Sequence, residues 1–154
     1  MTALAGLIAT WFFLGFVPKS PGTAGSLGAL AIAWALHTWT GMNAIGFGVL
    51  AVIGIAPAIW ASGVTARATG LKDPQIVVVD EVIGQWLTFA GAMRFNWKSW
   101  LLGFVLFRLF DIFKPPPTRQ LENVPGGAGI VLDDVMAGVY AALVLFAAGW
   151  FNLY

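Results

Sequence analysis

The sequence predicts an all-α protein, a small polytopic membrane bundle of about five or six membrane-embedded helices that forms one domain over residues 1–154. Three observations support this prediction. Hydrophobic residues make up 59% of the chain and charged residues only 10%, whereas soluble domains contain about 25% charged residues. Polar and Gly/Pro-rich stretches divide the chain into six apolar segments. The length of 154 residues leaves no room for a separate soluble domain.

The apolar segments span residues 1–17, 26–40, 43–62, 77–93, 98–113 and 132–152. The first segment is shorter than the ~20 residues that a spanning helix needs, so we expect it to be re-entrant or interfacial. It has no basic start and no small-residue cleavage site, so we do not expect a secretory signal that is removed. The loop that follows residue 113 opens with three prolines, which cannot continue a helix.

Threading the chain with one crossing per segment places the loops 18–25, 63–79 and 114–131 on one face of the membrane. The opposite face then carries only two basic residues, Arg94 and Lys98. By the positive-inside rule, the face with more basic residues is cytoplasmic. Six basic residues lie on that face: Lys19, Arg67, Lys72, Arg108, Lys114 and Arg119.

Most of the acidic residues lie inside or at the ends of apolar segments, where an ionised carboxylate is costly unless it is paired, hydrated or bound to a metal. Asp80 and Gly84 are four residues apart, as are Asp134 and Gly138, so each acid shares a helix face with a glycine that lets a neighbouring backbone approach. The alternative is that the acids cap helix N-termini. The number of acids on one face favours a functional site instead. These acids are Asp80, Glu81, Asp111, Asp133 and Asp134.

Basic residues accompany the acids on the same face. Arg108, Asp111 and Lys114 follow one another at three-residue spacing and can project along one stripe, although an ion-paired helix end would look similar. The three basic residues Lys19, Arg108 and Lys114 balance three of the five acids, so two negative charges remain uncompensated. A site with only oxygen ligands and residual negative charge favours Mg²⁺ or Ca²⁺. The Gly-rich stretch 20–26 can present backbone N–H groups to an anion, or it can form a turn with a serine cap.

These features predict a metal-dependent enzyme that acts on the phosphate of a phospholipid headgroup at the cytoplasmic membrane face. The chain has no cysteine, which excludes thiolate metal sites and thiol nucleophiles. The single histidine, His37, lies nearer the opposite face, which excludes histidine-nucleophile phosphatases and Ser-His-Asp hydrolysis. We expect no nucleic-acid partner.

Two other classes of protein also use buried carboxylates. An ion- or proton-coupled transporter would need them near the middle of its segments. An intramembrane aspartyl protease would need two acids and no metal. The clustering of the acids towards one face favours the phospholipid enzyme.

Four blocks of sequence resemble the bacterial phosphatidylglycerophosphatase A family, in that family's order and over nearly the whole chain from about Gly15. The resemblance implies a Mg²⁺-dependent, multi-pass enzyme of the bacterial inner membrane with its active site on the cytoplasmic face. Its reaction would convert phosphatidylglycerophosphate to phosphatidylglycerol and inorganic phosphate, on the path to cardiolipin. Its expected partners are this lipid and the bilayer, and the sequence leaves protein partners open. The blocks are SPGTAGS (Ser20–Ser26), DEVIGQW (Asp80–Trp86), FRLFDIFKPPP (Phe107–Pro117) and GGAGIVLDDVMAG (Gly126–Gly138).

The resemblance also suggests roles for individual residues. Asp111 is expected to bind the metal or to support a metal ligand. The residues leave open whether an aspartyl-phosphate forms or water attacks phosphorus directly. Direct attack is favoured because no acid lies in a DxDx[TV] context. The expected metal ligands or water-activating bases are Asp80, Glu81, Asp133 and Asp134, and the expected phosphate-binding residues are Arg108 and Lys114, assisted by Lys19, Thr23 and Ser26.

Overall fold

The computed structural model describes residues 2–154, and these residues form helices and no β-strand. The prediction of an all-α protein is therefore confirmed. Residue 1 of the expected first segment lies outside the described part of the chain. The helices are α1 (Ala3–Ala9), the 3₁₀ helix η1 (Leu14–Phe16), α2 (Pro21–Thr40), α3 (Ala44–Thr69), α4 (Val79–Phe89), α5 (Trp97–Phe113), α6 (Thr118–Leu121) and α7 (Gly127–Trp150).

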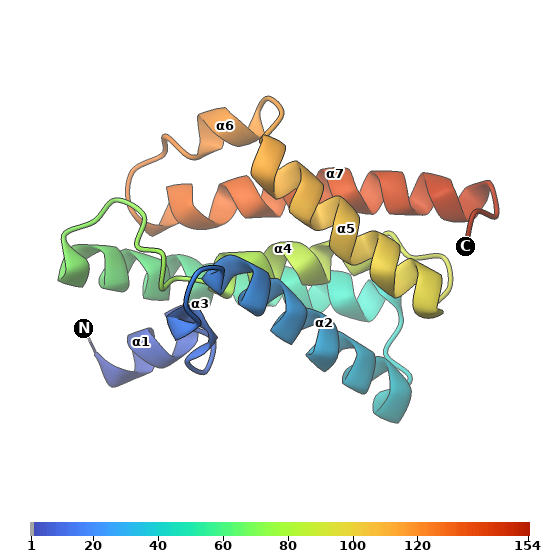
Figure 1. The fold of residues 1–154 in the computed structure, drawn as a ribbon, viewed down its shortest axis with the longest axis horizontal. Helices are drawn as coiled ribbons and strands as arrows, with labels where there is room; N and C mark the ends of the chain where they lie inside the picture. The colour runs from blue at the N-terminus through green and yellow to red at the C-terminus, as the bar shows by residue number, and fades with distance from the viewer. Residues whose placement is uncertain (1) are drawn as a thin grey trace.

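The helices α2, α3, α4, α5 and α7 run back and forth along the long axis of the molecule (Figure 1). The start of α2, the α3–α4 loop and the α5–α7 connection lie towards one end of the bundle. The α2–α3 turn, the α4–α5 loop and the C-terminus lie towards the other end. This arrangement agrees with the predicted threading of the chain from residue 18 onwards.

The first segment doubles back instead of running along the bundle. Helix α1 has only seven residues, and Trp11, Phe12 and Phe13 then adopt left-handed backbone conformations with φ of 44°, 54° and 73°. The Val78 amide donates to the Ala9 carbonyl oxygen at 2.8 Å and ties the end of α1 to the loop before α4. Residues 2–17 therefore contain no helix long enough to cross a membrane, which fits the expectation of a re-entrant or interfacial segment and not the threading of one crossing per segment.

Several helices begin or end away from the expected positions. Helix α2 begins at Pro21, because proline favours the first helical position, so Thr23 and Ser26 lie in helical turns and not in a loop. Helix α3 continues to Thr69, where Gly70 ends it in a left-handed conformation with φ of 72°. Helix α4 covers only 11 residues of the expected segment 77–93.

Two of the described helices, α3 with 26 residues and α7 with 24, are long and apolar enough to cross a membrane by length and composition. Large apolar side chains are also exposed on the surface, among them Trp39, Ile45 and Ile53. Exposed apolar surface on this scale is typical of a face that contacts lipid or another protein.

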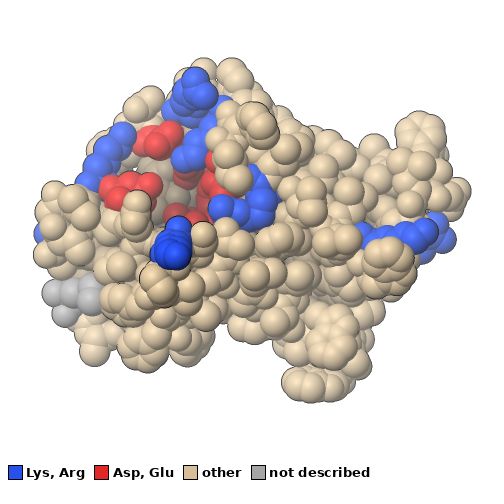
Figure 2. Space-filling view, viewed as in Figure 1, with Lys and Arg blue, Asp and Glu red and all other residues tan. Residues whose placement is uncertain are grey.

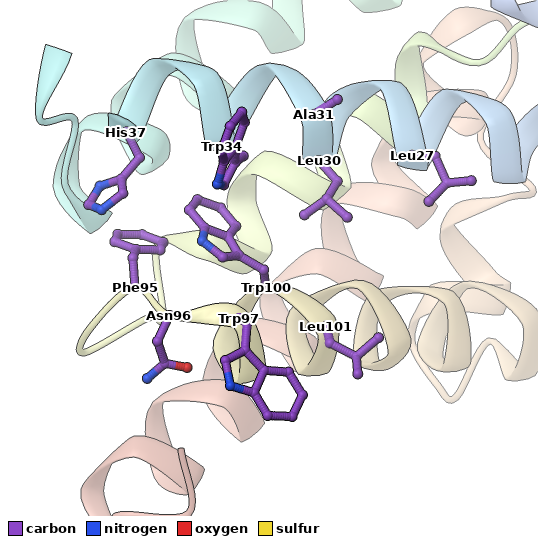
Figure 3. Close-up of a pocket in the computed structure, with 10 residues that line it drawn as sticks. All are labelled: Leu27, Leu30, Ala31, Trp34, His37, Phe95, Asn96, Trp97, Trp100 and Leu101. Carbon is purple, nitrogen blue, oxygen red and sulfur yellow. The ribbon is translucent and has the colours of Figure 1, made fainter. Parts of the chain in front are cut away.

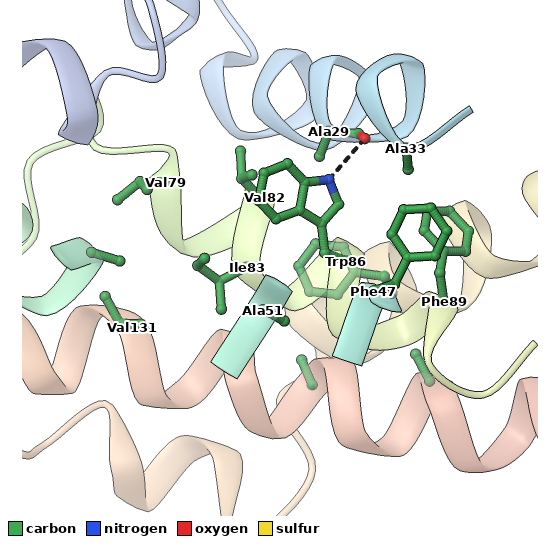
Figure 4. Packing of buried hydrophobic residues seen from close by; sticks show 14 of the residues in the cluster. Ala29, Ala33, Phe47, Ala51, Val79, Val82, Ile83, Trp86, Phe89 and Val131 are labelled. Carbon is green, nitrogen blue, oxygen red and sulfur yellow. Dashed lines mark hydrogen bonds between the residues drawn. The ribbon is translucent and has the colours of Figure 1, made fainter. Parts of the chain in front are cut away.

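Helix α4 forms the centre of the bundle. Nine of its 11 residues are buried, and it packs against α7, α3 and α2. The Trp86 indole N–H donates to the Ala29 carbonyl oxygen of α2 at 3.1 Å (Figure 4). Phe89 packs edge-on against Phe47 of α3 and Trp100 of α5. These contacts fix the position of α4 between its neighbours.

Two glycines allow α4 and α7 to cross in close contact. A Cβ atom on Gly84 would lie 2.6 Å from the carbonyl oxygen of Asp134, and one on Gly138 would lie 2.5 Å from the carbonyl oxygen of Gly84. Small residues at helix crossings permit this approach of two backbones. The backbone approach that the glycine spacing predicts is confirmed, and it brings Asp80 and Asp134 to the same place.

We predict that Gly138→Ala lowers the free energy of unfolding by roughly 1–3 kcal/mol, because the added methyl group must push two backbones apart. The measurement is unfolding in mixed detergent micelles, followed by circular dichroism.

Gly46→Ala is the matched control, because a Cβ atom there meets the flexible side chain of Met42 and not a backbone. Equal stability of the Gly138→Ala variant and the wild type would contradict the close crossing of α4 and α7.

Candidate functional site

Three carboxylates from two helices meet where α4 crosses α7. Asp80 and Glu81 lie in the first turn of α4, and Asp134 lies in α7. One oxygen of each carboxylate lies within 4.8 Å of the other two. The residues that precede α4 and α7 are Val78 and Gly126, and neither makes a side-chain capping hydrogen bond. None of these acids is therefore an N-cap residue, although Asp80 and Glu81 do occupy the first turn of α4, where acidic residues are favoured.

The three carboxylates are short of compensating partners. Asp80 and Asp134 are only 8% and 4% exposed. Asp80 Oδ1 and Glu81 Oε2 are buried without a hydrogen-bond partner among the described residues. Adjacent ionised carboxylates in a poorly hydrated site repel one another unless a cation or protons neutralise them. A group of oxygen donors with orphaned buried atoms fits a hard divalent cation such as Mg²⁺ or Ca²⁺.

Asp133 lies next to this group but is engaged by Lys114. Lys114 Nζ donates to Asp133 Oδ2 at 2.7 Å and lies 3.6 Å from Glu122 Oε2. Burial lowers the pKa of the Lys114 amine, but the hydrogen bond and charge of Asp133 and the charge of Glu122 outweigh this effect and raise the pKa above its ordinary value. Lys114 is therefore a permanent cation. Asp133 Oδ1 remains buried and without a partner.

Arg108 and Asp111 form a second ion pair on α5, with Arg108 Nη1 2.7 Å from Asp111 Oδ2. Arg108 Nη1 also lies 3.5 Å from the hydroxyl oxygen of Ser26, and that hydroxyl donates to the Gly22 carbonyl oxygen at 3.0 Å. A Cβ atom at Gly22 would overlap the Glu81 carboxylate. The absence of a side chain at Gly22 therefore lets the first turn of α2 lie directly against Glu81 and Arg108.

These groups surround a polar basin of about 340 Å³ at one end of the bundle. Figure 2 shows the basin as a hollow with acidic side chains inside and basic side chains around it. Six acidic and three basic side chains line it, so negative charge is in excess. The N-terminus of α2 also opens into it, which adds free N–H groups and a positive helix dipole. The basin is lined by Lys19, Ser20, Pro21, Gly22, Thr23, Asp73, Gln75, Val77, Asp80, Glu81, Arg108, Asp111, Lys114, Ile130, Asp133 and Asp134.

Nine of the ten candidate site residues from the sequence therefore line one basin. The exception is Ser26, which is fully buried and reaches the basin only through its contact with Arg108.

Two further residues, Asp73 and Gln75, also line the basin, although the sequence pattern did not indicate them. Burial raises the pKa of Asp73, although the charge of Lys114 lowers it. Both residues belong to the polar loop between α3 and α4. The only feature of the local sequence that sets them apart is the Asp73-Pro74 pair, which indicates a turn and not a functional site.

Comparisons with known proteins place this chain among lipid phosphatases. A family model described as phosphatidylglycerophosphatase A matches residues 7–149. The phosphatidylglycerophosphatase A of Escherichia coli is 37% identical over 144 residues, which cover 93% of this chain and 82% of that protein. The corresponding protein of Haemophilus influenzae is 32% identical over 148 residues, with 96% and 90% coverage.

A further relative has a different name. A protein of Bacteroides thetaiotaomicron, named "Putative phosphatidylinositol-3-phosphatase", is 40% identical over 149 residues, which cover 94% of this chain and 92% of that protein. No solved structure matches the chain.

We predict that Lys114→Met lowers the free energy of unfolding by roughly 2 kcal/mol, because it leaves Asp133 buried without its cation. In the double variant Lys114→Met/Asp133→Asn the loss should be smaller than the sum of the two single losses. The control is Lys98→Met, because Lys98 is exposed and lies at the other end of the bundle. This substitution should change the free energy of unfolding little. If the losses of unfolding free energy in the two single variants add up to the loss in the double variant, the two side chains do not interact.

Proposed function

Because the chain belongs to the phosphatidylglycerophosphatase A family, we propose that it hydrolyses phosphatidylglycerophosphate to phosphatidylglycerol and inorganic phosphate with the help of Mg²⁺. The observation that carries this proposal is the group of three carboxylates, two of them buried, beside the N-terminus of α2 and three basic side chains. A metal-binding group and an anion-binding group in one basin are the two elements that metal-dependent phosphate-ester hydrolysis uses.

In this proposal Asp80, Glu81 and Asp134 hold the Mg²⁺ ion, and Asp133, also expected as a ligand, keeps Oδ1 free to accept a proton. When bound, Mg²⁺ supplies positive charge that neutralises the carboxylates and stabilises the phosphoryl oxygens as the ester bond breaks. Asp111 supports the site through its ion pair with Arg108.

The substrate phosphate would bind between the N-terminus of α2 and the basic side chains. Arg108 can direct two N–H groups at phosphate oxygens in a fixed geometry, and Ser26 orients it. Lys19 and the hydroxyl of Thr23 lie at the same wall of the basin. Lys114, held by Asp133, would contribute charge to the opposite side. These contacts position the phosphorus atom for attack by water.

The proton of the attacking water needs an acceptor, and Asp133 suits this role. Lys114 stabilises its ionised form, and Asp133 Oδ1 makes no other hydrogen bond among the described residues. Water would form the new P–O bond while the bond to the lipid oxygen breaks, and the proton would pass to that leaving oxygen. We propose this direct route over an aspartyl-phosphate.

We also propose that the chain is one domain that crosses the bacterial inner membrane several times, with the basin on the cytoplasmic side. The basin end carries six basic residues against Arg94 and Lys98 at the other end, which favours this orientation. Helices α3 and α7 are long enough to cross the bilayer, and the basin would then lie at the headgroup level.

Two alternatives differ from this proposal in what they require of the basin. A transporter would need carboxylates midway along its spanning helices, whereas Asp80, Glu81 and Asp111 lie at the basin ends of α4 and α5. The name of the Bacteroides relative suggests phosphatidylinositol 3-phosphate, which presents the same phosphomonoester group on a bulkier headgroup.

We expect the purified protein to release phosphate from phosphatidylglycerophosphate in detergent micelles, to lose this activity with EDTA and to regain it with Mg²⁺. Asp134→Asn should lower the rate by about 100-fold or more, since substitutions that only support metal ligands already cost 10–100-fold. Lys98→Met, at an exposed position at the other end of the bundle, is the control. Wild-type activity of Asp134→Asn would contradict the assignment of the site, and a preference for phosphatidylinositol 3-phosphate would replace the proposed substrate.

Arg108→Lys should reduce kcat/KM by about 10-fold or more, because a lysine keeps the charge but cannot make the two parallel hydrogen bonds of the guanidinium group. The measurement compares kcat/KM of the variant and the wild type at saturating Mg²⁺. Lys98→Arg, far from the basin, controls for a change in cation type. An Arg108→Lys variant as active as the wild type would mean that Arg108 acts only as a charge.

A further inference from the structure

The largest described cavity is an apolar groove that lies away from the carboxylates. It has a volume of about 730 Å³ and lies between α2 and α5 (Figure 3). Leu27 and Leu30 project from α2 towards α5. The groove falls in the range of 300–1,000 Å³ typical of ligand pockets. It is lined by Leu27, Leu30, Ala31, Trp34, His37, Phe95, Asn96, Trp97, Trp100 and Leu101.

Helices α2 and α5, which form the groove, also contribute residues to the polar basin. On α2, the basin residues end at Thr23 and the groove residues begin at Leu27, one helical turn later. On α5, the groove residues end at Leu101 and the basin begins at Arg108, two turns later. The contact of 3.5 Å between Ser26 and Arg108 lies between the two. A ligand anchored in the basin can therefore continue along the same pair of helices into the groove.

The far end of the groove is closed by aromatic packing. The rings of His37 and Phe95 lie 4.6 Å apart, and Phe95 stacks on Trp100 at 4.6 Å. His37 Nδ1 lies 2.8 Å from the carbonyl oxygen of Met42, which fixes the imidazole ring. The distance along α2 from Leu27 to His37 is about 15 Å at 1.5 Å per residue. This length equals about half of the 30 Å hydrocarbon core of a bilayer, the depth that one acyl chain occupies.

We propose that this groove binds one acyl chain of the phospholipid substrate while its headgroup phosphate occupies the basin. The proposal rests on the proposed function, because it takes the basin as the phosphate site. Exposed apolar side chains at Leu27, Trp34 and Leu101, which are 48%, 53% and 54% exposed, leave the groove open along its side, so a lipid can enter laterally from the bilayer. Because the chain is already out of water in the bilayer, van der Waals packing against these side chains would favour the groove over the surrounding lipid.

The first test compares two substrates that share one headgroup: dioleoyl phosphatidylglycerophosphate and its water-soluble deacylated form. We expect Leu27→Trp and Leu101→Trp, which narrow the groove, to lower kcat/KM for the dioleoyl lipid about tenfold and to leave kcat/KM for the deacylated form unchanged. Val52→Trp, an equally bulky change at an exposed position of α3, is the control. An unchanged ratio of the two kcat/KM values in both groove variants would overturn the proposal.

The second test does not depend on turnover. A phosphatidylglycerophosphate analogue with a diazirine in one acyl chain is photolysed in Mg²⁺ with the Asp133→Asn variant, which keeps the three proposed metal ligands but lacks the proposed proton acceptor, and labelled peptides are identified by mass spectrometry. We expect labels on residues 27–34 and 97–101. We expect few labels on the exposed apolar residues of α3, such as Val49, Val52 and Ile53. Equal labelling of the groove by a phosphatidylcholine diazirine probe would identify a general lipid surface and overturn the proposal. Selective labelling together with no phosphate release by the wild-type protein in Mg²⁺ would instead support the groove and contradict the proposed reaction.

Discussion

The close crossing of α4 and α7 at Gly84 and Gly138 is the constraint on which the rest of the site depends. Each glycine lies one helical turn from an acidic residue, so the same contact that packs the helices also brings Asp80 and Asp134 together. A larger residue at either position would separate the backbones and the carboxylates at once. Helix packing thus forces the three carboxylates close together, although their negative charges repel one another. A divalent cation bound between them would offset this repulsion.

Much of the helical framework could be predicted from the sequence because apolar segments and breakers are local signals. The span 98–113 agrees closely with α5 (Trp97–Phe113). The first segment could not be predicted in the same way, since its reversal depends on left-handed backbone at Trp11–Phe13 and on a hydrogen bond to Val78. The early start of α2 was also missed, because a Gly/Pro-rich stretch indicates a loop unless its proline occupies the first helical position.

The location of the candidate site was predicted better than the contacts within it. Threading the helices was enough to gather the acids and bases at one end of the bundle. It could not show that Asp133 pairs with Lys114 and not with the other acids, or that Ser26 lies behind Arg108. Those contacts depend on rotamers and helix rotation. Asp73 was missed because a single acid in a polar linker is an ordinary solvated residue until the fold buries it.

The central claim is that Asp80, Glu81 and Asp134 bind one divalent cation. The most direct test is anomalous diffraction from crystals of the protein grown with Mn²⁺ in place of Mg²⁺. We predict an anomalous peak within coordination distance of all three carboxylates, at about 2.0–2.3 Å from their oxygens for a cation of this size. A peak bound only by Asp111 or Glu122, or well-ordered Asp80 and Asp134 carboxylates hydrogen-bonded to each other with no peak between them, would contradict it.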